Sequence, residues 1–163
     1  MSLTYSNTTS PTLPGAPMTD AERNARAKVD DIAAAFELVR AANSQFGLER
    51  DALSYDAISL LGDISWDADD GLATLADEVD EYIRQQPLSI RAHGHSDDGL
   101  TWDVDYHHIW LTFGGPSCWI ICPDDTDADP EVWFSQAGTP SSQLRLTPSQ
   151  LDAVRSFCEV NVP

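Results

Sequence analysis

The chain has 163 residues, of which 27 are acidic and 9 are basic, so its formal net charge is −18. This charge excludes binding to the phosphate backbone of DNA or RNA by bulk positive charge, because such binding uses Lys and Arg side chains that release counterions. Hydrophobic residues make up 42% of the chain and include five tryptophans, which excludes a disordered acidic tail, since such tails lack the apolar surface needed to offset chain entropy.

Residues 1–17 are rich in Ser, Thr, Pro and Gly and predict a flexible leader before a single domain at 18–163. The leader has neither the basic nor the apolar region of a signal peptide, and no segment is apolar for long enough to cross a membrane. We therefore expect a cytoplasmic protein that makes no membrane contact.

The helical part of the domain, 18–86, predicts three helices. Thr19 and Glu22 have the spacing of a capping box at the start of a helix over about 20–45, with Gly47 as its stop. Two further helices are expected over about 50–61 and 67–86, ended by Gly62 and Pro87.

The second part, 87–163, predicts a sheet because apolar and polar side chains alternate. A terminal helix is expected after Thr147, with Pro148 at its first position. The order of elements predicts an α+β fold: N-terminal helices, an antiparallel β-meander of about four to five strands and a C-terminal helix. The expected strand segments are about 88–93, 102–107, 109–113, 118–122 and 132–136, with a short one around Leu144 and Leu146.

The negative charge is concentrated in the middle of the chain. Residues 1–50 carry a net charge of −1 and residues 132–163 a net charge of zero, so residues 51–131 carry −17. Adaptation to high salt would spread acids over the whole surface, and the balanced charge of the two flanking segments disfavours this interpretation. A second interpretation, an acidic surface that only keeps the protein soluble, stays open. The third interpretation is a surface that binds a basic partner, because crowded like charges destabilise a fold.

The third predicted helix carries acids at helical spacing. Asp77 and Glu81 are four residues apart, where like charges repel by roughly 0.2–0.5 kcal/mol. Helix formation alone does not favour this arrangement, which supports a binding role. The candidate partner-binding residues are acids of this helix, of the second strand and of the turn at 123–130: Asp69, Asp70, Asp77, Asp80, Glu81, Asp103, Asp105, Asp125, Asp127 and Asp129.

Three of these acids alternate as in the first half of a calcium-binding EF-hand loop. The motif fails at Pro130, which stands where glycine must make the sharp turn, and at Gln136, which stands where a bidentate Glu should close the loop. The sequence therefore predicts a solvated acidic turn.

Four histidines form two close pairs near acidic residues. Adjacent histidines of a regular strand point to opposite faces, and no spacing here is typical of metal ligands. We therefore predict surface histidines, with no metal, no cofactor and no catalytic residue. A metal-dependent enzyme stays open as an alternative, because in regular strands His93 and His95 would share one face, and Asp103, Asp105 and His107 would share another.

Two other motifs have structural interpretations. Gly114-Gly115-Pro116 predicts a tight turn and not a phosphate-binding loop, because no Lys-Ser/Thr pair follows and no helix begins there. Three cysteines offer no disulfide framework and are expected to be small core residues: Cys118, Cys122 and Cys158.

Two segments of the sheet carry a family resemblance. Leu111–Pro116 end in Gly-Gly-Pro, Ile120 lies in the next expected strand, and Phe134–Pro140 contain Gln-Ala-Gly-Thr-Pro before the helix that follows Thr147. This pattern resembles an uncharacterised family of small phage, plasmid and other mobile-element proteins, although Ala137 replaces the family's aromatic residue. The resemblance implies a mobile-element origin, a location in the cytoplasm of a bacterial or archaeal host, and no established activity.

These observations lead to one hypothesis and two alternatives. The hypothesis is a non-enzymatic inhibitor that binds a basic, nucleic-acid-binding host complex, such as a CRISPR effector or a restriction enzyme, by DNA mimicry. The protein itself is expected not to bind nucleic acid. The first alternative is a protein-binding module that acts at an allosteric site or a homodimer surface through exposed Trp66, Trp119 and Trp133. The second is the metal-dependent enzyme that uses the histidine pairs.

Overall fold

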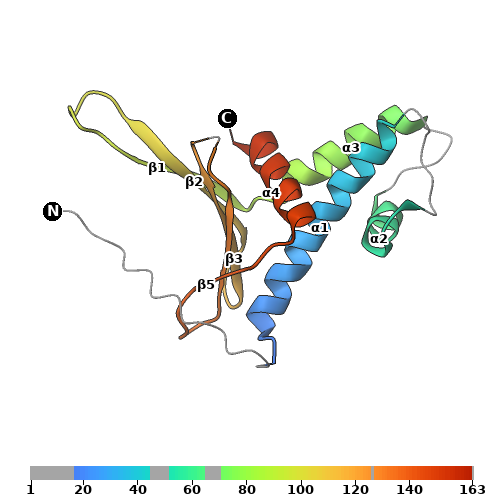
Figure 1. Ribbon diagram of the computed structural model, residues 1–163, viewed down its shortest axis with the longest axis horizontal. Helices are drawn as coiled ribbons and strands as arrows, with labels where there is room; N and C mark the ends of the chain where they lie inside the picture. The colour runs from blue at the N-terminus through green and yellow to red at the C-terminus, as the bar shows by residue number, and fades with distance from the viewer. Residues whose placement is uncertain (1–16, 45–51, 65–70, 126, 163) are drawn as a thin grey trace.

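The helical part is built around α1 (Asp20–Ala42), the longest helix in the part of the chain that the computed structural model describes, residues 17–44, 52–64, 71–125 and 127–162 (Figure 1). Thr19 Oγ1 accepts a hydrogen bond from the Glu22 backbone N–H at 3.1 Å, which confirms Thr19 as the cap. The Glu22 side chain instead pairs with Arg26 at 2.9 Å, so no reciprocal bond of a capping box forms. The expected stop, Gly47, lies outside the described residues.

The second helix, α2 (Tyr55–Asp63), starts later than predicted. Ser54 caps it through a hydrogen bond from the Ala57 backbone N–H, and Ser54 in turn donates two hydrogen bonds to Glu37 of α1. Gly62 lies within this helix and does not end it. The third helix, α3 (Gly71–Gln85), is shorter than predicted over its described residues, because 67–70 lie outside them.

The second part forms one antiparallel sheet with strand order β1-β2-β3-β4-β5. The two strands expected at 102–107 and 109–113 are one continuous strand, β2. The alternation of apolar and polar residues shifts by one position between these two segments. The reason is that the outer half of β2 is exposed, whereas the inner half packs one face against the helices. The strands are β1 (Ser89–His95), β2 (Asp103–Thr112), β3 (Ser117–Pro123), β4 (Glu131–Ser135) and β5 (Ser142–Gln143).

The end of the chain returns to the helical side of the sheet. The predicted position of the short strand around Leu144 and Leu146 was wrong by two residues, because β5 ends before Leu144. The backbone N–H of Leu144 donates a hydrogen bond to the Val132 carbonyl at 2.8 Å. The chain closes with α4 (Pro148–Asn161), for which Thr147 and Gln150 form a reciprocal capping box. This confirms the predicted start of the terminal helix.

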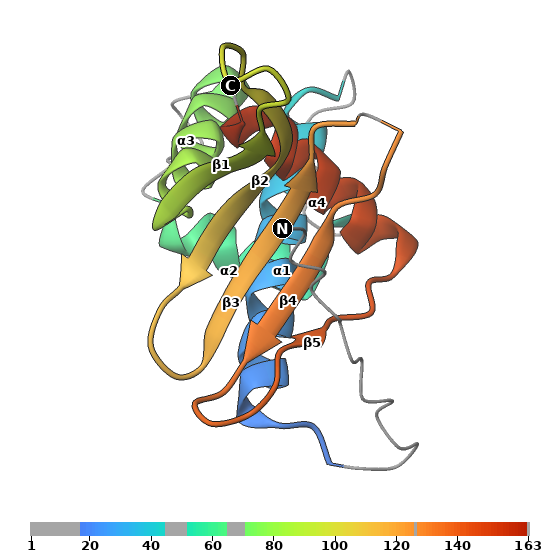
Figure 2. The same cartoon turned by 90° about the vertical axis from the view of Figure 1, so that its left-hand side faces the viewer.

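The core lies between the helices and one face of the sheet. All four described helices lie on the same side of the strands (Figure 1), and the opposite face is turned toward the viewer in Figure 2. Ile109, Ile120 and Val132 are paired across neighbouring strands and fully buried against this helical layer. The helices contribute fully buried Leu38, Leu75 and Phe157. Four helices and a five-stranded antiparallel sheet make the fold α+β, as predicted.

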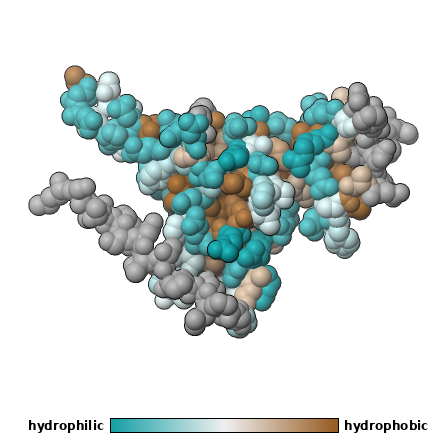
Figure 3. All heavy atoms as spheres, in the orientation of Figure 1, coloured by the Kyte–Doolittle hydropathy of each residue, from teal (hydrophilic) through white to brown (hydrophobic). Residues whose placement is uncertain are grey.

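Apolar side chains are exposed at the side of the molecule, where the helical layer meets the sheet (Figure 3). Figure 3 shows hydrophobic residues gathered between the strands and the helices. A groove of about 780 Å³ runs there, and Phe134, Leu144, Leu146 and Leu151 are among its lining residues. None of the described helices is both long and apolar enough to cross a membrane.

Candidate functional site

Three acidic segments that are separate in the sequence lie on the side of the molecule away from the start of α1, and two of them adjoin. In Figure 1 the β1–β2 hairpin projects to the upper left and helix α3 lies at the upper right, with the turn at 123–130 between them; all three lie above the start of α1 in both views (Figures 1 and 2). The backbone N–H of Asp124 binds the carbonyl of Asp105 at 3.1 Å, which joins the turn to the hairpin. We call this region the acidic end; it contains Asp77, Asp80, Glu81, Asp97, Asp98, Asp103, Asp105, Asp124, Asp125, Asp127, Asp129 and Glu159.

Helix α3 presents its acids on the face away from the core. Leu75, Val79 and Ile83 are buried on the opposite face, whereas Asp77 and Glu81 are exposed. Asp80 is half-buried and pairs with Arg84 at 2.8 Å. Glu81 accepts a hydrogen bond from the Gln85 side chain at 2.6 Å. Asp69 and Asp70, also predicted to take part, lie outside the described residues.

The β1–β2 hairpin contains a bulge that moves Asp105 out of register. His93 pairs with Tyr106 and the next residue, Gly94, pairs with Val104, so Asp105 has no partner residue on β1. Its carboxylate lies 3.1 Å from His95 Nδ1. This hydrogen bond, then the charges of Asp105 and Asp97, raises the pKa of His95. The simple alternation predicted for these strands is therefore wrong at this point, because the bulge interrupts it.

The tip of the hairpin is held by Asp98. Its carboxylate accepts hydrogen bonds from the backbone N–H groups of Leu100 and Thr101, both at 2.8 Å, and from the Thr101 hydroxyl at 3.0 Å. These bonds to Thr101 and Leu100 lower the pKa of Asp98. The tip is therefore an ordered acidic turn, although the sequence did not single out Asp98.

The turn at 123–130 is ordered by its own aspartates. Asp125 accepts a hydrogen bond from the Asp127 backbone N–H at 3.0 Å, in the manner of an Asx turn. Asp129 pairs with Arg155 of α4, which also contacts Asp152 at 3.3 Å. Asp125, Asp127 and Asp129 are all exposed. The described residues thus place these acids in a surface turn.

Four of the predicted acids have no cation beside them. Asp80, Asp105 and Asp129 each form an ion pair. Among the described residues, no Lys, Arg or His nitrogen lies within 4.0 Å of the remaining four, Asp77, Asp103, Asp125 and Asp127. The acidic end therefore carries uncompensated charge that a basic surface could neutralise.

The sheet face away from the helices carries a row of aromatic side chains. Trp110, Trp119 and Trp133 are directly paired across β2, β3 and β4. The ring centroids of Trp110 and Trp119 lie 5.0 Å apart, and His108 stacks on Trp110 at 4.7 Å. Phe113 extends the row, 5.0 Å from Trp110. We call these five residues the aromatic face.

The burial of this row corrects the predicted aromatic site. Trp119 and Trp133 are only 9% and 7% exposed, because neighbouring rings and the Glu131 side chain, which accepts a hydrogen bond from Trp133 Nε1 at 2.8 Å, cover them. Phe113 is 56% exposed. Trp66 lies outside the described residues. The accessible part of the aromatic face is therefore at Phe113 and the half-buried Trp110 and His108.

The four histidines are separated by the sheet. His107 is buried, whereas His93 and His108 lie on the aromatic side, where His93 stacks on Tyr106 at 4.9 Å. Burial, then the nearby His93 and Arg91, lowers the pKa of His108. Over the residues that the structure describes, no three His, Cys, Asp or Glu side chains are grouped to hold a metal ion. The surface metal site kept as an alternative therefore does not assemble among these residues, and the predicted surface position is wrong for His107, because β2 turns this side chain toward the helices.

Two groupings were not predicted from the sequence. The stack of His93, Tyr106, His108 and Trp110 could have been found from the alternation of rings along β2. The pairing of Cys122 with Cys158 had no sequence signal, because these residues come from different elements far apart in the chain. All three cysteines are buried, as expected.

Comparisons with protein families, curated proteins and solved structures find no match for this chain.

Proposed function

We propose that this protein is a non-enzymatic inhibitor whose acidic end binds the nucleic-acid-binding surface of a host defence complex, a CRISPR effector or a restriction enzyme, as a DNA mimic. The observation that carries the proposal is that the acidic turn at 123–130 adjoins the acidic β1–β2 hairpin, with α3 on the same side of the fold. The resemblance to mobile-element proteins supports the choice of a defence complex as the partner.

The presentation of the charges supports mimicry. Asp103 and Asp105 are both exposed on one strand, two residues apart. Bonds within the hairpin tip and the turn hold neighbouring carboxylates in place before a partner arrives. Carboxylates arranged in this way can accept charge-assisted hydrogen bonds from Arg and Lys side chains that otherwise bind phosphates. Association should then be fast and sensitive to salt.

The test uses displacement of DNA-binding proteins. A bacterial lysate is bound to DNA-cellulose and eluted with the purified protein at constant ionic strength. We expect elution of a defined basic complex by the natural chain, and loss of elution with the triple variant Asp103→Asn, Asp125→Asn and Asp127→Asn. These substitutions leave the ion pairs of Asp105 and Asp129 intact, and the amide oxygen of an asparagine in place of Asp125 can still accept the turn hydrogen bond.

The matched control changes the same amount of charge elsewhere. Asp20, Asp56 and Asp63 are exposed residues of α1 and α2, and neither helix adjoins the hairpin or the turn that the test variant changes. The variant Asp20→Asn, Asp56→Asn and Asp63→Asn has the same net charge as the test variant and should elute the complex as the natural chain does. Equal loss of elution in both variants would show that bulk charge, and not the acidic end, is responsible.

A second candidate function is binding of a protein partner through the aromatic face. It is supported by the exposure of Phe113 beside Trp110 on a sheet face that no described helix covers. Such binding should change little with ionic strength, whereas binding by the acidic end should weaken steeply as salt screens it. Trp110→Ala with Phe113→Ala should abolish only the salt-insensitive mode. A second copy of the chain as partner would be detected as a dimer by light scattering.

A further inference from the structure

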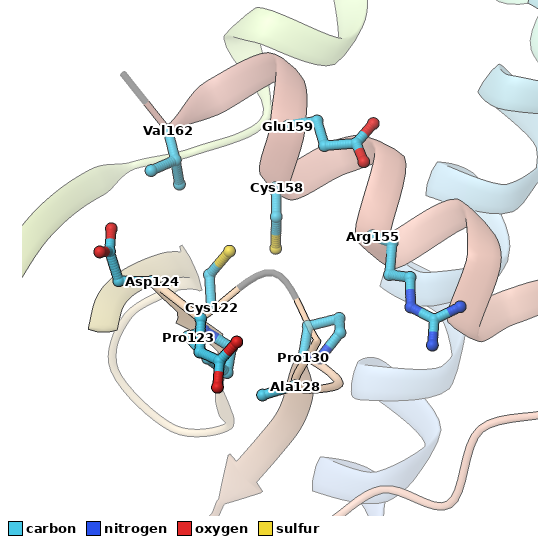
Figure 4. Close-up of a pocket in the computed structure, with 10 residues that line it drawn as sticks. Cys122, Pro123, Asp124, Ala128, Pro130, Arg155, Cys158, Glu159 and Val162 are labelled. Atoms are coloured by element: carbon cyan, nitrogen blue, oxygen red, sulfur yellow. The ribbon is translucent and has the colours of Figure 1, made fainter. Parts of the chain in front are cut away.

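A small pocket at the acidic end brings together two thiols from different elements. Cys122 lies near the end of β3, and Cys158 lies in the last turns of α4. Figure 4 shows their sulfur atoms pointing toward one another across the pocket. The pocket has a volume of about 220 Å³, and its other lining residues include Asp124, Pro130, Arg155 and Glu159.

The surrounding structure holds the two elements together. The side chains of Cys122 and Cys158 lie close enough to shift each other's pKa. The neighbouring Phe157 is fully buried in the core, which fixes the rotation of α4 about its axis. Arg84 of α3 donates a hydrogen bond to the Val160 carbonyl at 3.2 Å and so ties down the end of α4. The two sulfur atoms are therefore positioned against each other by the fold.

We propose that Cys122 and Cys158 form a thiol modification site, at which a peroxide converts them into an intramolecular disulfide between β3 and α4. The Cys122 thiolate attacks the peroxide O–O bond, which breaks to give a Cys122 sulfenic acid and, with one proton, a first water molecule. The Cys158 sulfur then attacks the Cys122 sulfur and displaces the hydroxyl group as a second water molecule. Two thiols lose two electrons in total, and hydrogen peroxide is reduced to two waters.

The environment assigns different roles to the two thiols. The neighbouring Cys158 side chain lowers the pKa of Cys122, against the opposing effects of burial and of Asp124 and Glu159. The neighbouring Cys122 side chain, then burial, raises the pKa of Cys158. Because the thiolate is the reactive form, Cys122 is the attacking group and Cys158 the resolving one.

The third cysteine provides an internal control. Cys118 is fully buried on the same strand as Cys122. Burial raises its pKa to about 12, so its thiolate is scarce near neutral pH. It lines none of the described pockets, so it should neither react nor pair.

The experiment treats the reduced full chain with hydrogen peroxide. We expect the intact mass to fall by two hydrogen atoms, the titratable thiols to fall from three to one, and a non-reducing peptide map to join Cys122 to Cys158. The disulfide closes the chain between 122 and 158 and should raise Tm by roughly 5–10 °C, reversed by a reducing agent.

Variants separate this outcome from others. Cys118→Ser should oxidise and gain stability as the natural chain does, whereas Cys122→Ser and Cys158→Ser should show no change in Tm with peroxide. Retention of all three thiols, a linkage that includes Cys118, or a disulfide between two chains would overturn the proposal. None of these results depends on the acidic end binding a partner, so the two proposals can fail separately.

Discussion

The Asp105 carboxylate lies 3.1 Å from His95 Nδ1 across the bulged β1–β2 hairpin, and this contact makes the acidic end sensitive to pH. The pKa of His95 is raised, first by the hydrogen bond with Asp105 and then by the Asp105 and Asp97 charges. A raised pKa in the folded state gives stabilisation that is complete below the unfolded value of about 6.5 and is lost as pH rises through the folded value.

Asp105→Asn should therefore return the pKa of His95 toward about 6.5. The NMR titration of the His95 ring protons measures this change directly. The variant should also lose stability relative to the natural chain at pH 6 but not at pH 9, as followed by thermal unfolding. An unchanged His95 titration in Asp105→Asn would contradict the assignment.

His108 should make the fold sensitive to acid in the opposite sense. Burial, then His93 and Arg91, lowers its pKa, so the folded state resists protonation while the unfolded state accepts it. Stability should consequently fall as pH decreases through about 6.5 toward the lower folded value. His108→Phe preserves a ring beside Trp110 and should reduce this part of the loss between pH 7 and 5. Equal acid sensitivity of the variant and the natural chain in thermal unfolding would refute the prediction.

Gly94 should be intolerant of any side chain. A Cβ atom at this position would lie 1.9 Å from the Asp103 carbonyl oxygen, so the bulge requires glycine. Gly94→Ala should displace the hairpin backbone and destabilise the protein, by roughly 1–3 kcal/mol in urea unfolding. Gly62→Ala is the matched control, because Gly62 lies within α2 with open space around it. This control should be neutral or stabilising by about 0.5–1 kcal/mol.

Helix α3 should become more stable when its charge pattern is corrected. Glu81→Lys places a cation at i,i+4 and i,i+3 spacing from Asp77 and Glu78, where Glu81 is a like charge, and near the helix end. We expect the free energy of unfolding to rise by about 0.5–1 kcal/mol, with Glu81→Gln intermediate. Elution of the complex from DNA-cellulose should weaken in the same order. A variant that gains stability and retains full elution would remove α3 from the proposed interface.

The elements were predictable where local rules act, and less so where neighbours decide. Thr19 and Thr147 cap their helices because a side-chain oxygen needs only the N–H two or three residues on. The start of α2 was missed because Ser54 also binds Glu37 of another helix. The single strand β2 was divided in two because its halves have different surroundings, an exposed hairpin and a covered core.

The sequence by itself determined the fold class, the buried cysteines and the concentration of negative charge between 51 and 131, because periodicity and composition follow from the order of side chains. Only the tertiary structure decided that the acidic turn adjoins the acidic hairpin, that Trp119 and Trp133 are covered by their neighbours, and that Cys122 meets Cys158. Those relationships depend on how strands pair and helices pack, and pairing joins residues that no local pattern connects.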